Sequence, residues 1–138
     1  MCKEYDQARD IIKKTKIDLV KLLSGIKNIE TFEERETLKI YENLIETIDE
    51  SEGYLDYLKN PTKEGVLENN PKTGMYYICF DDGTSGADLE CGNVLELCDS
   101  LGGWHVSGIE KNIDGRYYFN YGDWSPLLDR GFRARKRI

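Results

Sequence analysis

Cysteine and histidine side chains stand at even intervals in the stretch CGNVLELCDSLGGWH, residues 91–105. Cys91, Cys98 and His105 are seven residues apart, and Cys79 precedes the first of them by twelve. Zinc sites made of cysteine usually contain a closely spaced pair, because a tight turn aims both sulfurs at one metal ion. This stretch has no such pair, so we predict no metal site. We expect the cysteines to be buried or half-buried in strands, where they act as small apolar side chains.

Catalysis by one of these thiols would need a base, and His105 is the single histidine of the chain. The residues around the cysteines do not form the strand-to-helix turn that exposes a nucleophile. Carboxylates are too numerous in this acidic chain for their spacing to identify an acid–base pair. The sequence GTSG, residues 83–86, lacks the lysine of a phosphate-binding loop. We therefore predict a protein that is not an enzyme and that uses no cofactor.

Charge is distributed unevenly over the 138 residues, whose net charge is −7. Lysine and arginine are absent between Lys72 and Lys111, whereas the last nine residues, RGFRARKRI, carry five of them. The acidic interval is either a solvated face or a surface that contacts a basic protein. In the second interpretation the partner-binding residues are Asp81, Asp82, Asp88, Glu90, Glu96 and Asp99.

The basic end supports an alternative, in which the protein binds nucleic acid. Alternation along a final strand places Arg133, Arg135 and Arg137 on one side. These arginines either neutralise acidic strands of their own domain or contact phosphates, while exposed aromatic rings stack on bases. The residues of this alternative are Arg130, Arg133, Arg135, Lys136, Arg137 and Trp124.

Aromatic residues are concentrated between Tyr76 and Trp124. The interior of a small β-domain has room for only some of them. The others either pack against the helical part of the chain or line a binding groove at the surface.

Apolar residues recur at spacings of three and four from Tyr5 to Ile26, and again from Leu38 to Leu58, which predicts two amphipathic helices. Gly25 ends the first helix. Thr31 and Glu34 form a capping box, in which Thr31 caps the second helix and Glu34 reaches back to the Thr31 amide. Pro61 ends that helix at the residue before it.

The two helices are predicted to fold into an antiparallel hairpin over residues 1–60. Two helices alone cannot bury apolar stripes of this width. The hairpin therefore packs either against the downstream domain or against a second copy of itself, as a homodimer.

Beyond a hinge near residues 60–65 the pattern changes from helical spacing to alternation. Short strands are expected in GVLEN, MYYICF, the stretch around ADLE, NVLELC, GWHVSGIE, RYYFNY and FRARKR. Asp114-Gly115 predicts a hairpin turn, since both residues tolerate a positive φ. The fold class is therefore α+β, with a small antiparallel β-barrel over residues 64–138.

Residues 75–138 resemble a family of small bacterial proteins that is known only as a domain of unknown function. Its motif runs Leu-x-Cys-Gly, Leu-Glu-Leu, a Gly-x-Trp strand that ends in Ile-Glu, Gly-x-Tyr-Tyr and Gly-x-x-x-Arg. The matching residues are Leu89, Cys91, Gly92, Leu95, Glu96, Leu97, Trp104, Ile109, Glu110, Gly115, Tyr117, Tyr118, Gly131, Arg133 and Arg135. The resemblance implies an SH3-like barrel of the kind found in Gram-positive bacteria, their phages and mobile elements. It implies no activity, because the family has none assigned.

Small acidic proteins of mobile elements often bind host machinery, including nucleic-acid-guided nucleases. On this association the leading hypothesis is a non-enzymatic protein-binding module, whose acidic face engages or inhibits a host protein that handles nucleic acid. The chain has no apolar run of the length of a membrane span and does not begin with a secretory signal, so we expect it in the cytoplasm without a membrane partner.

Overall fold

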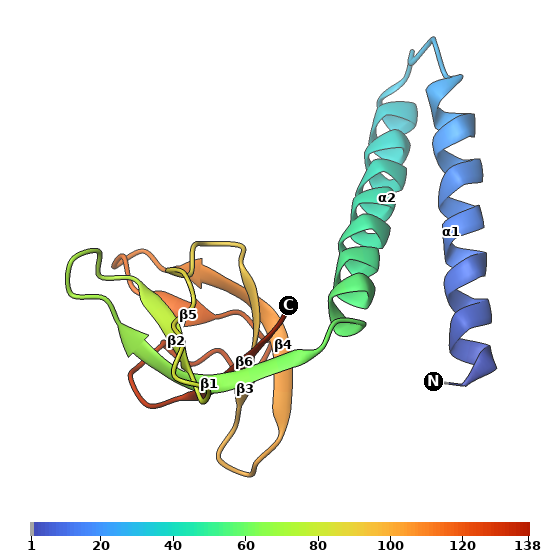
Figure 1. Cartoon of the computed structure of the whole chain (residues 1–138). Coiled ribbons are helices and arrows are strands. Elements are labelled where there is room, and N and C mark those ends of the chain that lie inside the picture. The colour runs from blue at the N-terminus through green and yellow to red at the C-terminus, as the bar shows by residue number, and fades with distance from the viewer. Residues whose placement is uncertain (1) are drawn as a thin grey trace. The chain divides into compact units, whose positions relative to one another are not determined.

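The structure, a computed structural model, describes residues 2–138 and divides into two units (Figure 1). The first unit ends at Tyr57 and the second spans Leu58–Ile138, close to the boundary that we predict from the sequence. The helices are α1 (Lys3–Ser24) and α2 (Phe32–Leu58). The strands are β1 (Thr62–Asn69), β2 (Tyr76–Phe80), β3 (Val94–Cys98), β4 (Trp104–Lys111), β5 (Tyr117–Phe119) and β6 (Arg133–Arg137). The α+β class is confirmed.

The helices form an antiparallel hairpin, whose ends follow the local signals of the sequence (Figure 1). The amide of Gly25 donates to the Leu22 carbonyl and closes α1. Thr31 Oγ1 accepts the Glu34 amide at 3.1 Å, so the predicted cap of α2 is confirmed. The Glu34 carboxylate, however, accepts the amide of Glu30 at 3.3 Å, one residue before the predicted partner. Within residues 2–138, neither helix combines the length and the apolar content that a membrane span requires.

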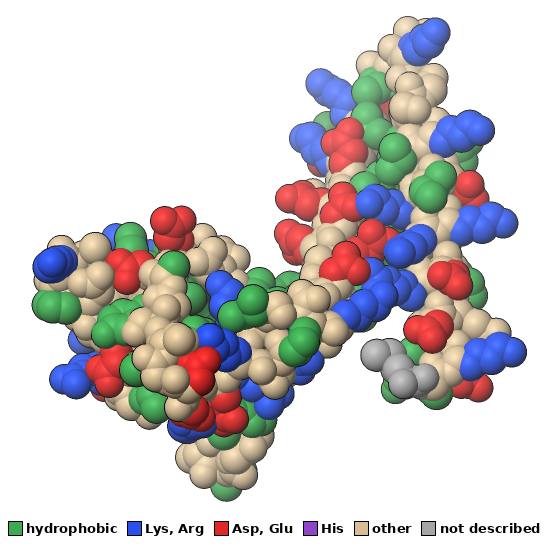
Figure 2. All heavy atoms as spheres, viewed as in Figure 1, with side chains coloured by type: hydrophobic (Ala, Val, Ile, Leu, Met, Phe, Trp, Pro, Cys, Tyr) green, Lys and Arg blue, Asp and Glu red, His purple; other side chains and the backbone are tan. Residues whose placement is uncertain are grey.

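Salt bridges join the two helices along one side of their seam. Arg9 pairs with Asp56, and Lys16 pairs with Asp49 and, at 3.8 Å, with Glu52. Figure 2 shows basic side chains that reach from α1 to acidic side chains of α2 on this side. The pKa of Lys16 is raised, chiefly because its ammonium group donates to Asp49. Neither helix contains a buried residue.

The strands form one antiparallel sheet in the order β2-β1-β6-β3-β4-β5, so that the first strand of the unit pairs with the last. Inward-facing side chains of the curved sheet and its loops form a single apolar core. The buried apolar residues are Leu67, Ile78, Phe80, Leu89, Leu95, Leu97, Ile109, Phe119, Leu128 and Ala134.

The sheet is open, not the closed barrel expected from the sequence, because within the described residues β2 does not pair with β5. Loop segments take the backbone hydrogen bonds that closure would require. Residues 84–89 bond to the outer edge of β2, and residues 126–128 bond to the outer edge of β5. The first of these segments contains most of the ADLE stretch, which is a loop and not the predicted strand.

Residues 62–65 of the predicted hinge are not a joint, because β1 already begins at Thr62. Thr62 lies opposite Arg137, and Gly65 lies opposite both Phe80 of β2 and Ala134 of β6. Gly65 is buried, and a Cβ atom there would lie 2.2 Å from the Cys79 carbonyl oxygen. The glycine therefore allows the close approach of two strands and does not supply a flexible joint.

Candidate functional site

The three arginine side chains of β6 pair with acids of their own unit. Arg133 donates to both oxygens of Asp81, at 3.0 and 2.8 Å, and lies 2.8 Å from a carboxylate oxygen of Glu64. These hydrogen bonds raise the pKa of Arg133 further above its ordinary value. Arg130 bonds to Glu68 at 2.9 Å. The sequence left two roles open for these arginines. In the structure they neutralise neighbouring acids of their own unit.

Glu96 lies between two arginines and is only 3% exposed. Its carboxylate accepts Arg135 Nη2 at 3.0 Å, Arg137 Nε at 3.1 Å and Arg137 Nη2 at 3.3 Å. The Arg135 guanidinium also lies over the ring of Trp104, 4.2 Å from its centroid. The pairing of β3 with β6 places Glu96 directly opposite Arg135. Glu96 therefore does not belong to an exposed acidic face, which corrects its predicted place there.

The remaining acidic residues of the predicted set stand in separate turns. Asp82 lies 3.0 Å from Lys63, and Glu90 is exposed. Asp88 accepts hydrogen bonds from Asn70 and Thr73. Asp99 accepts the amides of Leu101 and Gly103 and lies 2.7 Å from His105 Nε2. Asp82, Asp88 and Asp99 are thus each held by contacts within their own part of the β-unit.

The turn that holds Asp81 and Asp82 makes the β-unit sensitive to acid. Hydrogen bonds from Thr84 and Lys63 lower the pKa of Asp82 from 3.8 to about 2, and the hydrogen bond from Arg133 lowers the pKa of Asp81. A carboxyl group whose pKa falls on folding contributes stability above its unfolded pKa, and this contribution is lost as the pH falls through its folded pKa.

We therefore expect the urea midpoint of the β-unit to fall as the pH is lowered from about 4 to about 2, through the range between the two pKa values. Asp82→Asn removes part of this dependence. The measurement is urea unfolding at several pH values, followed by the fluorescence of Trp104 and Trp124, the two tryptophans of the chain. An unchanged pH profile in the variant would contradict the assignment.

Trp124, which the sequence offered as an exposed stacking ring, is half-buried. Its ring lies 5.0 Å from that of His105 and packs edge-on against Phe119 at 5.7 Å. The ring centroid of Tyr121 lies 4.8 Å from that of the same histidine. These rings extend the core toward the surface, where Tyr121 is 42% exposed.

The cysteines are less buried than expected from the sequence. Cys2, Cys79 and Cys91 are exposed, and Cys98 is half-buried. Cys79 points outward because Ile78 and Phe80, its neighbours in β2, point into the core. Among residues 2–138, no three His, Cys, Asp or Glu side chains are grouped as a metal site would require.

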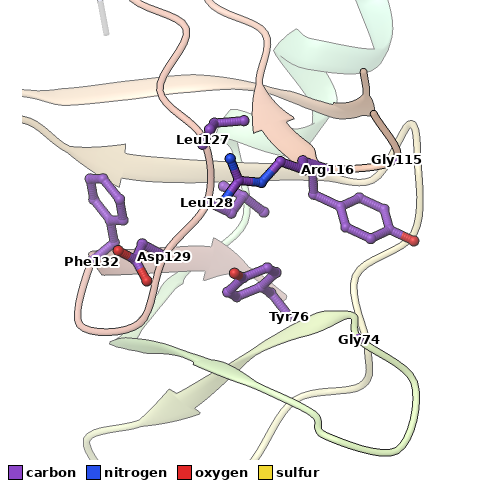
Figure 3. A pocket seen from close by; sticks show the side chains of 9 residues that line it. Gly74, Tyr76, Gly115, Arg116, Leu127, Leu128, Asp129 and Phe132 are labelled. Carbon is purple, nitrogen blue, oxygen red and sulfur yellow. The ribbon is translucent and has the colours of Figure 1, made fainter. Parts of the chain in front are cut away.

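One hollow of the β-unit is a groove of about 440 Å³. Three segments that are distant in the sequence form it: the β1–β2 turn, the β4–β5 turn and residues 127–132. Its side-chain lining consists mainly of Tyr76, Arg116, Tyr117, Leu127, Asp129 and Phe132. Figure 3 shows Arg116 extending across the groove, with Asp129 and Phe132 toward its other end.

The groove combines half-exposed apolar rings with one charge of each sign. Tyr76, Tyr117 and Phe132 are partly exposed, and Leu127 is 41% exposed. Sequence reasoning noted the aromatic residues but did not single out Arg116 and Asp129. The only local signal for Arg116 was its place beside the Asp114-Gly115 turn, which the structure confirms with a φ of 78° at Gly115.

Comparison of the chain with models of known protein families finds no match. Searches of curated proteins and of solved structures likewise find none. The resemblance of residues 75–138 to a domain family therefore stays a prediction, carried by its motif.

Proposed function

We propose that the protein is a non-enzymatic binding protein, and that the groove of its β-unit holds a segment of a protein partner. The observation that carries this proposal is the groove itself, whose volume of about 440 Å³ lies within the usual range of ligand sites. Arginine and aromatic side chains, which dominate its lining, are also the side chains that contribute most to protein–protein binding.

The ion pairs of β6 favour this groove over the other two candidate surfaces. Arg133, Arg135 and Arg137 already contact acids of the same unit. Binding to phosphate would require these pairs to open, so we expect weak affinity for nucleic acid. Asp81, Asp82 and Glu96 also pair with basic side chains of the same unit. These pairs make it less favourable for the acidic residues to serve as the main surface for a partner.

The groove indicates the chemistry of the segment that it holds. Tyr76, Tyr117 and Phe132 offer apolar surface for one large apolar side chain. Arg116 favours a carboxylate next to that side chain, because a guanidinium pairs with a carboxylate in two parallel hydrogen bonds. We therefore expect a partner segment with an apolar and an acidic residue. Whether this partner handles nucleic acid stays a prediction.

An SH3-like fold of the β-unit is part of the same proposal. It is supported by short strands, strong curvature and the pairing of the first strand with the last. The open edge between β2 and β5 lies at the groove, since Tyr76 belongs to β2 and Tyr117 to β5.

Selection of a displayed library of random peptides on the full chain tests this function. We expect enriched peptides to share an apolar residue beside an acidic one, and Tyr76→Ala or Arg116→Ala to weaken their binding about tenfold or more. The matched control is Leu101→Ala, because Leu101 is 94% exposed in the β3–β4 turn. Absence of enrichment, or peptides that bind the groove variants as well as the unaltered protein, would refute the proposal.

A further inference from the structure

The helical hairpin exposes apolar side chains on the side opposite its salt bridges. Half-buried residues mark the seam between the helices at heptad spacing. In α1 they are Arg9, Lys16, Leu19 and Leu23, and in α2 they are Leu38, Ile45, Ile48, Glu52 and Leu55. Glu36, Tyr54 and Tyr57 of α2 are also half-buried but lie outside this spacing. Ile12 and Tyr41 continue the same spacing at 41% and 42% exposure.

The residues one position before the seam are almost all uncharged. In α1 they include Ala8, Ile11, Thr15 and Leu22, and in α2 they are Thr37, Ile40, Leu44, Thr47, Ser51 and Tyr54. Asp18 is the one charged residue at these positions. Because the offset from the seam is the same in both helices of an antiparallel pair, the two rows lie on one side of the hairpin. We call these residues the uncharged face.

The residues one position after the seam lie on the other side. In α2 all of them except Gly53 are charged, whereas in α1 Asp10 and Lys13 are charged and Ile17, Val20 and Ser24 are not. Asp49 and Asp56, the salt-bridge partners of Lys16 and Arg9, belong to this row. In contrast, the uncharged face exposes Ile11 at 66%, Ile40 at 64% and Leu22 at 72%. Such exposure of large apolar residues in a row, along nearly the whole length of two helices, is typical of a contact surface.

Two threonine hydroxyl groups of this face already donate hydrogen bonds within their own helix. Thr15 Oγ1 donates to the Ile11 carbonyl at 2.8 Å, and Thr47 Oγ1 donates to the Asn43 carbonyl at 2.9 Å. Both hydroxyls therefore lose little when water is removed from the face. The face is roughly 33 Å long and about 20 Å wide, or on the order of 650 Å², if two helices lie side by side. A standard protein–protein interface takes about 800 Å² from each partner, so the area of this face is close to what an interface needs.

We propose that this uncharged face packs against the same face of a second copy of the chain, so that two hairpins form a four-helix bundle. A two-fold interface brings one surface into contact with itself, and a face almost without charge meets its own copy without repulsion. The interface also buries the apolar residues that a two-helix unit cannot bury alone.

Charge favours one of the two arrangements that a face-to-face dimer allows. The segment α1 has six basic and four acidic residues, a net charge of +2, whereas α2 has two basic and nine acidic residues, a net charge of −7. A two-fold axis parallel to the helices places each α1 against the α2 of the other copy. An axis across the helices places α2 against α2, which is repulsive. The first arrangement brings both N-termini to the same end of the bundle.

Two matched substitutions test the dimer. Ile11 and Ile17 have the same side chain in the same helix, 66% and 65% exposed, but Ile17 lies one position after the seam. We expect Ile11→Glu to weaken dimerisation at least about 100-fold, because the change occurs twice at the interface. We expect Ile17→Glu to leave the dimer intact. Analytical ultracentrifugation of the full chain gives the dissociation constants, and Ile40→Glu repeats the test in α2.

Each outcome decides the proposal. A monomeric unaltered protein at 100 μM or above (about −5.5 kcal/mol or weaker), or equal dissociation constants for Ile11→Glu and Ile17→Glu, would overturn it. Loss of helical circular dichroism in Ile11→Glu but not in Ile17→Glu supports it, because an isolated hairpin gains nothing from an exposed isoleucine. Peptide binding to the groove is measured on the same variants, so that failure of the dimer and failure of the proposed function are separate results.

The arrangement is tested with Cys2, which precedes α1 and is exposed. In a chain with Cys79, Cys91 and Cys98 changed to serine, a bismaleimide that spans about half the ~33 Å length of α1 is expected to link two copies. Linkage supports the axis parallel to the helices. A dimer without linkage would overturn that arrangement, since the N-termini would then lie at opposite ends.

Discussion

Glu96→Gln is expected to destabilise the β-unit by about 3 kcal/mol or more. The Glu96 side chain is 4% exposed and holds two arginines, whose own side chains are 20–23% exposed. Glutamine keeps the size of the side chain but removes the negative charge, and its amide group presents hydrogens to the guanidinium groups. Two poorly hydrated positive charges are then left side by side, and the lost attraction appears as a loss of folding free energy.

Urea unfolding followed by tryptophan fluorescence measures this loss, since both tryptophans lie in the β-unit. Glu90→Gln is the matched control, because Glu90 is exposed, and we expect it to change the free energy of unfolding by less than about 0.5 kcal/mol. A loss of less than about 1 kcal/mol in Glu96→Gln would show that water already hydrates Arg135 and Arg137.

Gly65→Ala is also expected to destabilise the β-unit strongly, because β1 and β2 leave no space for a side chain at this position. An added Cβ atom would lie 2.2 Å from the Cys79 carbonyl oxygen and 2.7 Å from the Phe80 Cα atom. Both are backbone atoms, so relief requires the two strands to separate. We expect a loss of about 3 kcal/mol in the free energy of unfolding of the β-unit, again measured by fluorescence.

Gly53→Ala is the opposite control. Gly53 lies inside α2, and an added Cβ atom there has nothing within 4 Å. Alanine is preferred to glycine in a helix, so we expect a gain of about 0.5–1 kcal/mol in hairpin stability, measured by circular dichroism. If Gly65→Ala stabilised the protein as Gly53→Ala does, β1 and β2 could not approach each other as closely as described.

Local signals predicted much of this fold. Gly25, Thr31 and the Asp114-Gly115 turn act on residues next to them, so their effects are visible in the sequence. The start of β1 is different, because Thr62 is held by Arg137 at the other end of the unit. The part of the predicted hinge from Thr62 to Gly65 is therefore ordered by strand pairing that no local pattern reveals.

The candidate site depended on long-range order in the same way. Alternation placed Arg133, Arg135 and Arg137 together, but only the pairing of β6 with β3 showed that Glu96 neutralises two of them. The groove was not predictable, because its lining comes from three segments that the fold brings together. The exposure of Cys79 was visible in its alternation with Ile78 and Phe80, but the general tendency of cysteine to be buried obscured it.

The loops along the two outer strands also protect the protein from polymerising. An exposed strand edge can pair with the same edge of another molecule and begin a fibril. Here residues 84–89 and 126–128 occupy the backbone groups of β2 and β5 that such growth would use. Concentrated solutions of the protein should therefore remain clear for as long as these loops are intact, and a protease that cuts within them should convert the β-unit into an aggregating species.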